Sequence, residues 1–216
     1  MIRLVTLKKL VLVLALMLLP MDSTLAQLQP QETLQPTGNS ALISPTTGVN
    51  YTRLRNLLQA QKWREANDET LNLMLKAAHR DTQGWVTTEN IEALSCWDLK
   101  TIDSLLKEYS NGRFGFSVQL PIFLSTGNRP GRLVSDDAFQ AFGDRIGWRK
   151  NGDWITFKGN LTYNLNAPEG HLPFPRSEYQ ITGGRLEYTT LAKRMLECGL
   201  ITLPSNEAKP PIQTKP

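Results

Sequence analysis

Apolar residues recur three and four positions apart through the middle of the chain, which is the spacing of amphipathic helices. Asn50 and Ser135 can cap the starts of two such helices, and Gly199 stands where another would stop. The pattern predicts five helices, at about residues 50–63, 65–78, 98–109, 135–146 and 188–198. We therefore expect an all-α fold built as a single helical domain.

The stretches between these helices are polar, aromatic and rich in glycine and proline. The longest, residues 143–175, holds an Asn151-Gly152 pair between Trp148 and Trp154, which predicts a hairpin turn. Long connections are uncommon in compact domains unless they carry function. We therefore expect structured loops around the helices, with a binding site among them.

The two ends of the chain do not continue the helical pattern. Residues 1–26 begin with basic residues, continue with an apolar run and end in Thr24-Leu25-Ala26, which is the order of a secretory signal. The apolar run is shorter than the roughly 20 residues that span a bilayer. We expect export to a periplasm or thylakoid lumen, or membrane association if the leader is retained. The remaining chain divides into a flexible linker at 27–49, a folded domain at 50–203 and a disordered tail at 204–216.

The expected export affects the redox state of the two cysteines, Cys96 and Cys198. In an oxidising compartment they could form one disulfide. They could equally be two buried thiols beside apolar helix faces. The sequence leaves both possibilities open, because pairing requires the two Cα atoms to lie within about 7 Å.

Charge and motif content argue against several functions. The net charge is +4 without a block of basic residues, so a nucleic-acid partner is not indicated. His79 and His171 are the two histidines and form no paired metal motif, and nucleotide-phosphate and serine-hydrolase motifs are missing as well. The sequence therefore favours a binding protein over an enzyme, with no metal or cofactor required.

Three loop segments combine glycine with aromatic and basic side chains. In the first, residues 112–119 (GRFGFSVQ), two phenylalanines either plug a corner of the core or form the floor of a ligand site beside Arg113. The others are residues 143–154 and 166–176. Together they indicate an apolar cavity for a flat ligand with acidic edges.

These segments resemble the genomes-uncoupled-four family of porphyrin-binding proteins. The matching motifs are residues 112–119, Gly147-Trp148 with Asn151-Gly152-Asp153-Trp154, and Ala167-Pro168-Glu169-Gly170-His171-Leu172-Pro173. Trp63, Gly84-Trp85 and the residues from Asp98 to Asp103 also follow the family pattern, in the expected order over about residues 50–200.

The resemblance implies a helical, cupped domain whose concave surface binds protoporphyrin IX or Mg-protoporphyrin IX. Members of the family are not enzymes. They bind the large porphyrin-binding subunit of magnesium chelatase and stimulate chlorophyll synthesis in cyanobacteria and photosynthetic eukaryotes. Carried over by position, the porphyrin-binding residues are expected to be Trp85, Val86, Ile91, Leu94, Arg113, Phe114, Phe116, Trp148, Trp154, His171, Leu172, Pro173 and Arg176.

The chain departs from the family pattern at four positions. Asn67 stands in place of Asp, Ser95 in place of Pro, Leu106 in place of Trp and Glu169 in place of a basic residue. An acidic side chain at position 169 would repel a porphyrin propionate, so Arg145 or Arg176 would have to compensate.

The predicted leader is the larger departure. Magnesium chelatase works where ATP is available, so an exported domain would not meet it. We therefore expect a tetrapyrrole carrier or regulator outside the cytoplasm. Two alternatives are an exported protein-interaction module that has lost the pocket, and haem binding through His171.

Overall fold

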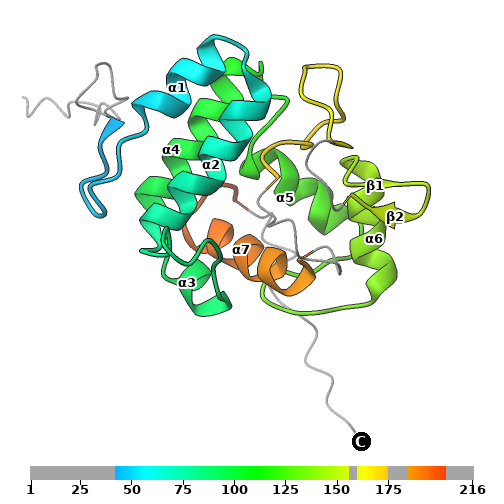
Figure 1. The fold of residues 1–216 in the computed structure, drawn as a ribbon. Helices are drawn as coiled ribbons and strands as arrows, with labels where there is room; N and C mark the ends of the chain where they lie inside the picture. Colours follow the sequence, from blue (N-terminus) through cyan, green and yellow to red (C-terminus); the bar gives the residue numbers. More distant parts are fainter. Residues whose placement is uncertain (1–41, 156–159, 175–183, 203–216) are drawn as a thin grey trace, which may run out of the picture. The chain divides into compact units, whose positions relative to one another are not determined.

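The computed structural model describes residues 42–155, 160–174 and 184–202, all within one unit spanning residues 36–216 (Figure 1). The elements are α1 (Thr52–Gln59), α2 (Trp63–Ala77), α3 (Thr88–Glu92), α4 (Cys96–Tyr109), α5 (Phe116–Ser125), α6 (Asp136–Arg145), β1 (Arg149–Lys150), β2 (Asp153–Trp154) and α7 (Arg185–Glu197). This composition confirms the predicted helical fold class. None of the helices in these ranges combines the length and the apolar character needed to cross a bilayer.

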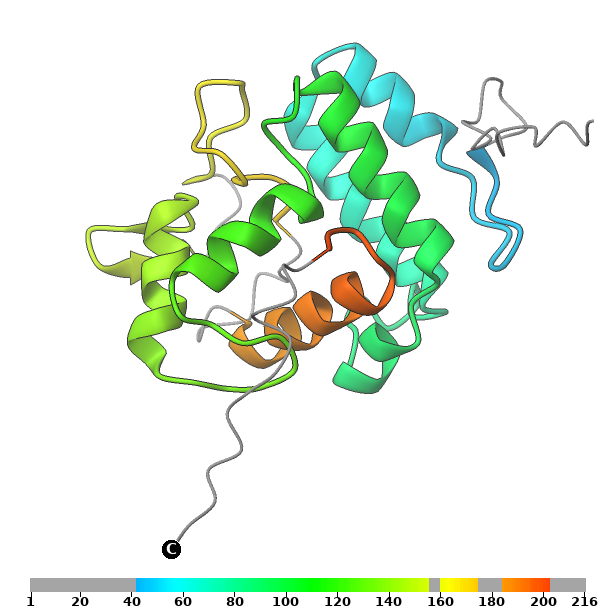
Figure 2. The same cartoon turned by 180° about the vertical axis from the view of Figure 1, so that it is seen from behind.

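Helices α1, α2 and α4 pack against one another (Figures 1 and 2). Leu54 and Leu58 of α1 are completely buried in the shared core. Trp63, the first residue of α2, meets Phe114 edge to face with ring centroids 5.3 Å apart. Each buried side chain of this size stabilises the fold by about 1.5–3 kcal/mol. The apolar stripes predicted from the sequence therefore hold this group of helices together.

Helices α5, α6 and α7 surround a cluster of aromatic rings. Tyr188 of α7 lies inside it, with its ring centroid 4.8 Å from that of Phe142 and 5.5 Å from that of Trp148. Such ring pairs contribute about 0.5–1.5 kcal/mol each beyond the area they bury. The cluster joins α7 to α6 and to Trp148, which follows α6. The start of α7 therefore lies beside the hairpin region.

Strands β1 and β2 form the predicted hairpin, with Arg149 paired to Trp154 and Lys150 to Asp153. The two turn residues between the strands have φ values of 54° and 89°. A two-residue turn of this kind needs positive φ at both positions, which Asn-Gly supplies at little steric cost. The hairpin prediction is confirmed.

Cys96 and Cys198 form a disulfide, with their Cα atoms 5.0 Å apart. It joins the first residue of α4 to the residue that caps the end of α7. A crosslink between positions 102 residues apart restricts the unfolded chain, and disulfides typically stabilise a fold by about 2–4 kcal/mol. Of the two possibilities that the sequence leaves open, the structure contains the disulfide.

The hydrophobic pattern does not predict α3 or α5. Helix α3 has five residues and is defined by its cap, because the Thr87 hydroxyl accepts from Asn90 N and the Asn90 side chain accepts from Thr87 N. Helix α5 contains Pro121, and its N-cap is Gly115, both typical of a loop. Its first turn is capped from another helix, because the Asp103 carboxylate accepts from Ser117 N at 2.8 Å.

Two predicted boundaries are wrong. The first helix does not continue to Trp63, because α1 ends at Gln59, Gln61 takes a φ of 54° and Trp63 begins α2. The predicted linker at 27–49 is ordered from Leu42 onward.

Side-chain hydrogen bonds order the end of the predicted linker. Leu42 is buried, and its carbonyl accepts from Tyr51 N at 2.8 Å. The hydroxyls of Thr47 and Tyr51 donate to the buried Asp98 carboxylate at 3.1 Å and 2.8 Å. A Ser/Thr-rich composition is typical of linkers, but these hydroxyls have a buried partner in α4, so the segment folds.

Candidate functional site

Two of the glycine-rich motifs bind each other through their backbones. Gly170 N donates to the carbonyl of Arg113, and Gly115 N donates to the carbonyl of Leu172, both at 2.9 Å. The Arg113 side chain donates from Nε to the carbonyl of Ala167 at 2.8 Å. Arg113 is therefore engaged in holding the loop.

Gln119 fixes the same loop from α5. Its amide nitrogen donates to the carbonyls of Gly170 (2.9 Å) and Pro173 (2.7 Å), and its amide oxygen accepts from the Tyr188 hydroxyl at 3.0 Å. The side chain is completely buried. Burial also raises the pKa of Tyr188 well above its ordinary value, so the phenol stays a hydrogen-bond donor. One buried amide thus connects α5, the loop at 170–173 and α7.

His171 is a structural residue in this arrangement. Its ring is 1% exposed, with Nδ1 2.7 Å from the carbonyl of Ile146 and Nε2 accepting from Thr162 N at 3.1 Å. These bonds require a neutral ring with its proton on Nδ1. Burial lowers the pKa of His171, and the bond to Ile146 offsets this only in part. Both nitrogens are occupied, which argues against haem ligation through this side chain.

Four of the predicted porphyrin contacts fill the core. Phe114, Phe116, Trp148 and Leu172 are at most 1% exposed, and Pro173 is also buried. The indole nitrogen of Trp148 donates to the carbonyl of His171 at 2.8 Å. The structure brings these residues together, but beneath the surface, so in this conformation they support a site and do not face it.

The predicted opposing loop divides into a buried part and an exposed part. Ile91 and Leu94 are buried, whereas Val86 is half-buried and Trp85 is 53% exposed. The Arg80 guanidinium lies over the Trp85 ring, 4.6 Å from its centroid. Trp85 is therefore a large apolar surface held in place without being covered by the core.

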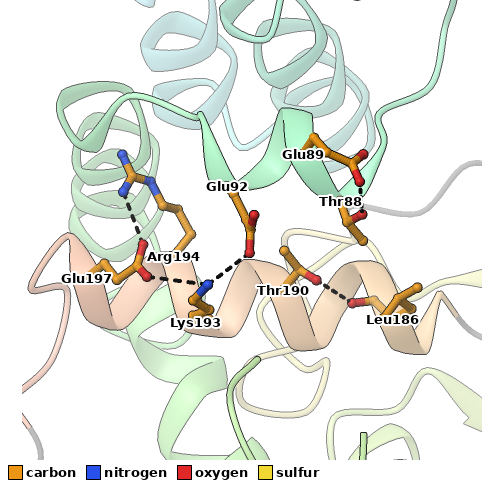
Figure 3. A network of polar contacts seen from close by, with 8 residues as sticks. All are labelled: Thr88, Glu89, Glu92, Leu186, Thr190, Lys193, Arg194 and Glu197. Carbon is orange, nitrogen blue, oxygen red and sulfur yellow. Dashed lines mark hydrogen bonds and ion pairs between the residues drawn. The ribbon is translucent and has the colours of Figure 1, made fainter. Parts of the chain in front are cut away.

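Helix α3 positions this loop against α7. The Lys193 ammonium lies 2.9 Å from the Glu92 carboxylate, and Arg194 donates from Nε to the carbonyl of Leu94 at 2.8 Å. Figure 3 shows this polar seam along α7, with Glu92 opposite Lys193 and Thr88 toward Leu186 at the start of α7. The start of α3 thereby lies beside the first turn of α7.

On another side of the same turn lies a cleft of about 380 Å³, lined by Leu133, Asp136, Phe139, Gln140, Trp154, Arg185 and Leu186. Trp154 packs on Phe139 with ring centroids 5.0 Å apart. Gly143 makes this possible, because a Cβ there would lie 2.5 Å from the Trp154 ring. Arg185 pairs with Asp136 at the edge of the cleft. The cleft thus has an aromatic floor and a charged rim.

Two of the exposed large apolar side chains line this cleft. The large hydrophobic side chains exposed in the described part of the chain are Ile43, Trp85, Leu133 and Leu186, each at 45–53%. Leu133 and Leu186 line the cleft, and Trp85 precedes α3. We call Leu133, Trp154 and Leu186 the α7 rim. Isolated apolar surfaces of this kind are common, but a group of them beside one cleft is typical of a binding site.

Of the residues that line the cleft, the sequence predicts Trp154 but misses Leu133, Phe139, Arg185 and Leu186, and the predicted site residue Trp85 is not among them. Leu186 shares a helix face with Lys193, seven residues later, so it lies off the stripe that packs into the core. An apolar residue on the polar face of an amphipathic helix is the signal that could have identified it. No group of three or more potential metal ligands occurs within the described ranges.

Comparison with known proteins identifies the fold. The sequence pattern of the family described as GUN4-like matches residues 44–191. The chain belongs to the GUN4-like family. It is similar to the solved structure of GUN4 from Chlamydomonas reinhardtii, with a TM-score of 0.55 and 32% identity, covering 69% of this chain and 92% of that one. For ligand-free Arabidopsis thaliana GUN4 the TM-score is 0.53, with 28% identity over 66% of this chain and 93% of that one.

Curated relatives of this GUN4-like chain are longer proteins. A Ycf53-like protein of Synechocystis is 31% identical over 140 residues, which is 64% of this chain and 56% of the relative. The chloroplastic tetrapyrrole-binding protein of Arabidopsis thaliana is 31% identical over 138 residues, 59% of this chain and 49% of the relative. The chain spans about half the length of the curated relatives it matches.

The departures from the family pattern lie away from the α7 rim. Buried Asn67 accepts from Phe174 N at 2.7 Å, and Ser95 caps α4 by accepting from Asp98 N at 3.4 Å. Leu106 is buried in the core. Glu169 lies with Arg145 in a separate hollow, so its charge does not enter the cleft beside α7.

Proposed function

We propose that this GUN4-like chain is an exported, non-enzymatic tetrapyrrole-binding protein whose ligand sits against the α7 rim. The observation that carries the proposal is the grouping of exposed apolar side chains around the first turn of α7. The Arabidopsis relative is named a tetrapyrrole-binding protein, which agrees with a flat apolar ligand at such a surface.

The chemistry of the rim suits a protoporphyrin or its magnesium form. The Trp154–Phe139 stack and Leu186 offer an apolar face to one edge of a macrocycle. Arg185 at the edge of the cleft can exchange its partner Asp136 for a ligand propionate, since guanidinium groups bind carboxylates bidentately. No covalent step is required of the protein.

Export is supported by two features that are independent of the rim. Residues 1–26 have the order of a secretory signal, and the Cys96–Cys198 disulfide suits an oxidising compartment. An exported chain would carry or buffer a pigment and would not reach the large subunit of magnesium chelatase. Mass spectrometry of the mature N-terminus in periplasmic or lumenal extracts tests this. A mature chain that keeps residues 1–26 in the cytoplasm would contradict it.

Binding is tested by titrating the protein with deuteroporphyrin IX and following tryptophan fluorescence. The Leu186→Asp variant should bind at least about tenfold more weakly, because it replaces an apolar contact with a charge that repels propionates, and tenfold corresponds to about 1.4 kcal/mol. Ile43→Asp is the matched control, since Ile43 is similarly exposed at 45% but lies outside the cleft.

Both variants should unfold at the wild-type temperature, because the substituted side chains are exposed. If Leu186→Asp and Ile43→Asp bound deuteroporphyrin IX with equal affinity, the binding site would lie away from the rim. Absence of binding by the wild-type protein at micromolar ligand would contradict the proposed function itself and favour a protein-interaction module.

A further inference from the structure

A second surface, distant from the α7 rim in its residues, lies between α1 and α2. The chain turns back at residues 60–62, so α1 runs back along α2 (Figure 1), and Arg53 near the start of α1 pairs with Glu69 in the middle of α2. An open groove of about 630 Å³ follows this pair, lined by Asn50, Thr52, Arg53, Asn56, Leu57, Ala60, Lys62, Glu69 and Lys76. None of these residues lines the cleft beside α7.

The charge of the groove is positive. Glu69 is its single acidic residue, and Arg53 neutralises it at 3.0 Å; the Glu69 side chain is 6% exposed and that of Arg53 is 72% exposed. Lys62 and Lys76 are exposed, and neither has an ion-pair partner among the described residues. The groove therefore presents two ammonium groups whose charge the described chain leaves uncompensated.

The asparagine side chains of the groove have hydrogen-bond donors available to a ligand, because their amide oxygens already accept hydrogen bonds within the chain. The amide oxygen of Asn50 accepts from Thr52 N at 2.9 Å, and that of Asn56 accepts from the Arg55 side chain at 3.0 Å. The amide N–H₂ groups of these asparagines remain, and such groups donate only. A complementary ligand therefore supplies acceptors, such as carboxylates and backbone carbonyls, and can place an apolar group on Leu57.

The spacing of the lysines sets the size of that ligand. Lys62 and Lys76 stand at opposite ends of α2, and 14 residues at 1.5 Å per residue place their backbones about 21 Å apart. A small dicarboxylate cannot reach both. An extended peptide, at about 3.3 Å per residue, covers this length with about six residues.

We propose that the α1–α2 groove binds an extended acidic segment of a partner protein, with carboxylates near both of its ends and an apolar residue between them. This inference does not depend on tetrapyrrole binding. It gives the domain a surface for a protein partner that leaves the α7 rim open to a ligand.

The test is fluorescence anisotropy with two fluorescein-labelled octapeptides of the same composition. One carries two glutamates separated by five residues with leucine between them, and the other carries the two glutamates side by side. The first should bind at least about fivefold more tightly, and a version with lysine in place of glutamate should not bind. Affinity should fall as salt is raised, because the contacts are exposed ion pairs.

A second experiment reverses the charge of the two groove lysines. Lys62→Glu/Lys76→Glu should weaken binding of the first peptide at least about tenfold. Lys100→Glu/Arg129→Glu changes the net charge equally at exposed positions outside the groove and should bind like the wild type. Thermal unfolding of both double variants checks that the fold is intact.

Three results would overturn the proposal. They are no peptide binding up to millimolar concentration, equal weakening in the two double variants, and equal affinity for the two glutamate spacings. Binding of vesicles containing anionic lipid that requires Lys62 and Lys76, in the absence of peptide binding, would likewise replace the peptide with a membrane surface.

Discussion

The segments at 112–119 and 167–174, which we call the clamped motifs, differ from the α7 rim in burial and in the contacts that hold them. Most residues of these two segments are buried, and their backbones and side chains are hydrogen-bonded to one another. The α7 rim is partly exposed, and the residues around it are held by the Arg185–Asp136 ion pair and by stacking of Trp154 on Phe139. The motifs by which the chain resembles its family thus build the scaffold, whereas the side chains available to a ligand are individual apolar residues outside most of those motifs.

The largest effect on stability is expected at Gln119. Gln119→Ala would leave two carbonyls and the Tyr188 hydroxyl without their buried partner. At about 1–3 kcal/mol for each unsatisfied group, the free energy of unfolding should fall by about 4 kcal/mol. Urea unfolding measures this, with the exposed Gln59→Ala as the control. A loss below about 1 kcal/mol would mean that the clamped motifs do not depend on this amide.

Removing the disulfide should have the next largest effect. Cys96→Ser/Cys198→Ser should lower the free energy of unfolding by about 2–4 kcal/mol, because the unfolded chain gains freedom. Reductant should lower the wild-type melting temperature toward that of the variant and leave the variant unchanged. A wild-type protein that is equally stable with and without reductant would contradict the crosslink.

A smaller effect is expected from titration of His171. Its pKa is lowered in the folded state, so the unfolded chain binds the proton more tightly. Stability should therefore fall as the pH drops below about 6.5, the ordinary value in the unfolded chain, and continue to fall until the folded pKa is reached. His171→Asn keeps a donor for the Ile146 carbonyl and removes the titration, so its unfolding should depend less on pH between 7.5 and 5. The same slope in both proteins would contradict this.

The smallest effect on stability, and a large one on binding, is expected at the rim. Leu186→Asp should leave unfolding within about 0.5 kcal/mol of the wild type while weakening deuteroporphyrin binding. Gln119→Ala and Leu186→Asp thus separate the two regions, because one variant costs stability and the other costs affinity.

The sequence predicts the helical class because apolar stripes at Leu54 and Leu58 or at Phe139 and Phe142 are buried in the structure as expected. It misses α5 because Gly115 and Pro121 are typical of loops, and the carboxylate that caps this helix comes from Asp103, 14 residues earlier. Local pattern cannot reveal a cap supplied by another helix.

The candidate site was only partly predictable for a similar reason. Trp154 stands out as a large aromatic residue next to a predicted hairpin turn. Leu186 becomes part of a cleft only because tertiary packing places it beside Leu133. The sequence also does not decide between core and surface for Trp148, which the Phe142 and Tyr188 rings enclose.

The ring cluster has an optical consequence. Trp154 stacks on Phe139, Phe139 contacts Phe142, and Phe142 contacts Trp148, so the fully enclosed indole lies three ring contacts from the one in the cleft. A pigment that absorbs where indole emits accepts excitation energy over such a separation without touching the donor. Emission from Trp148 would therefore dim when a porphyrin occupies the rim, and its loss would measure proximity, not contact.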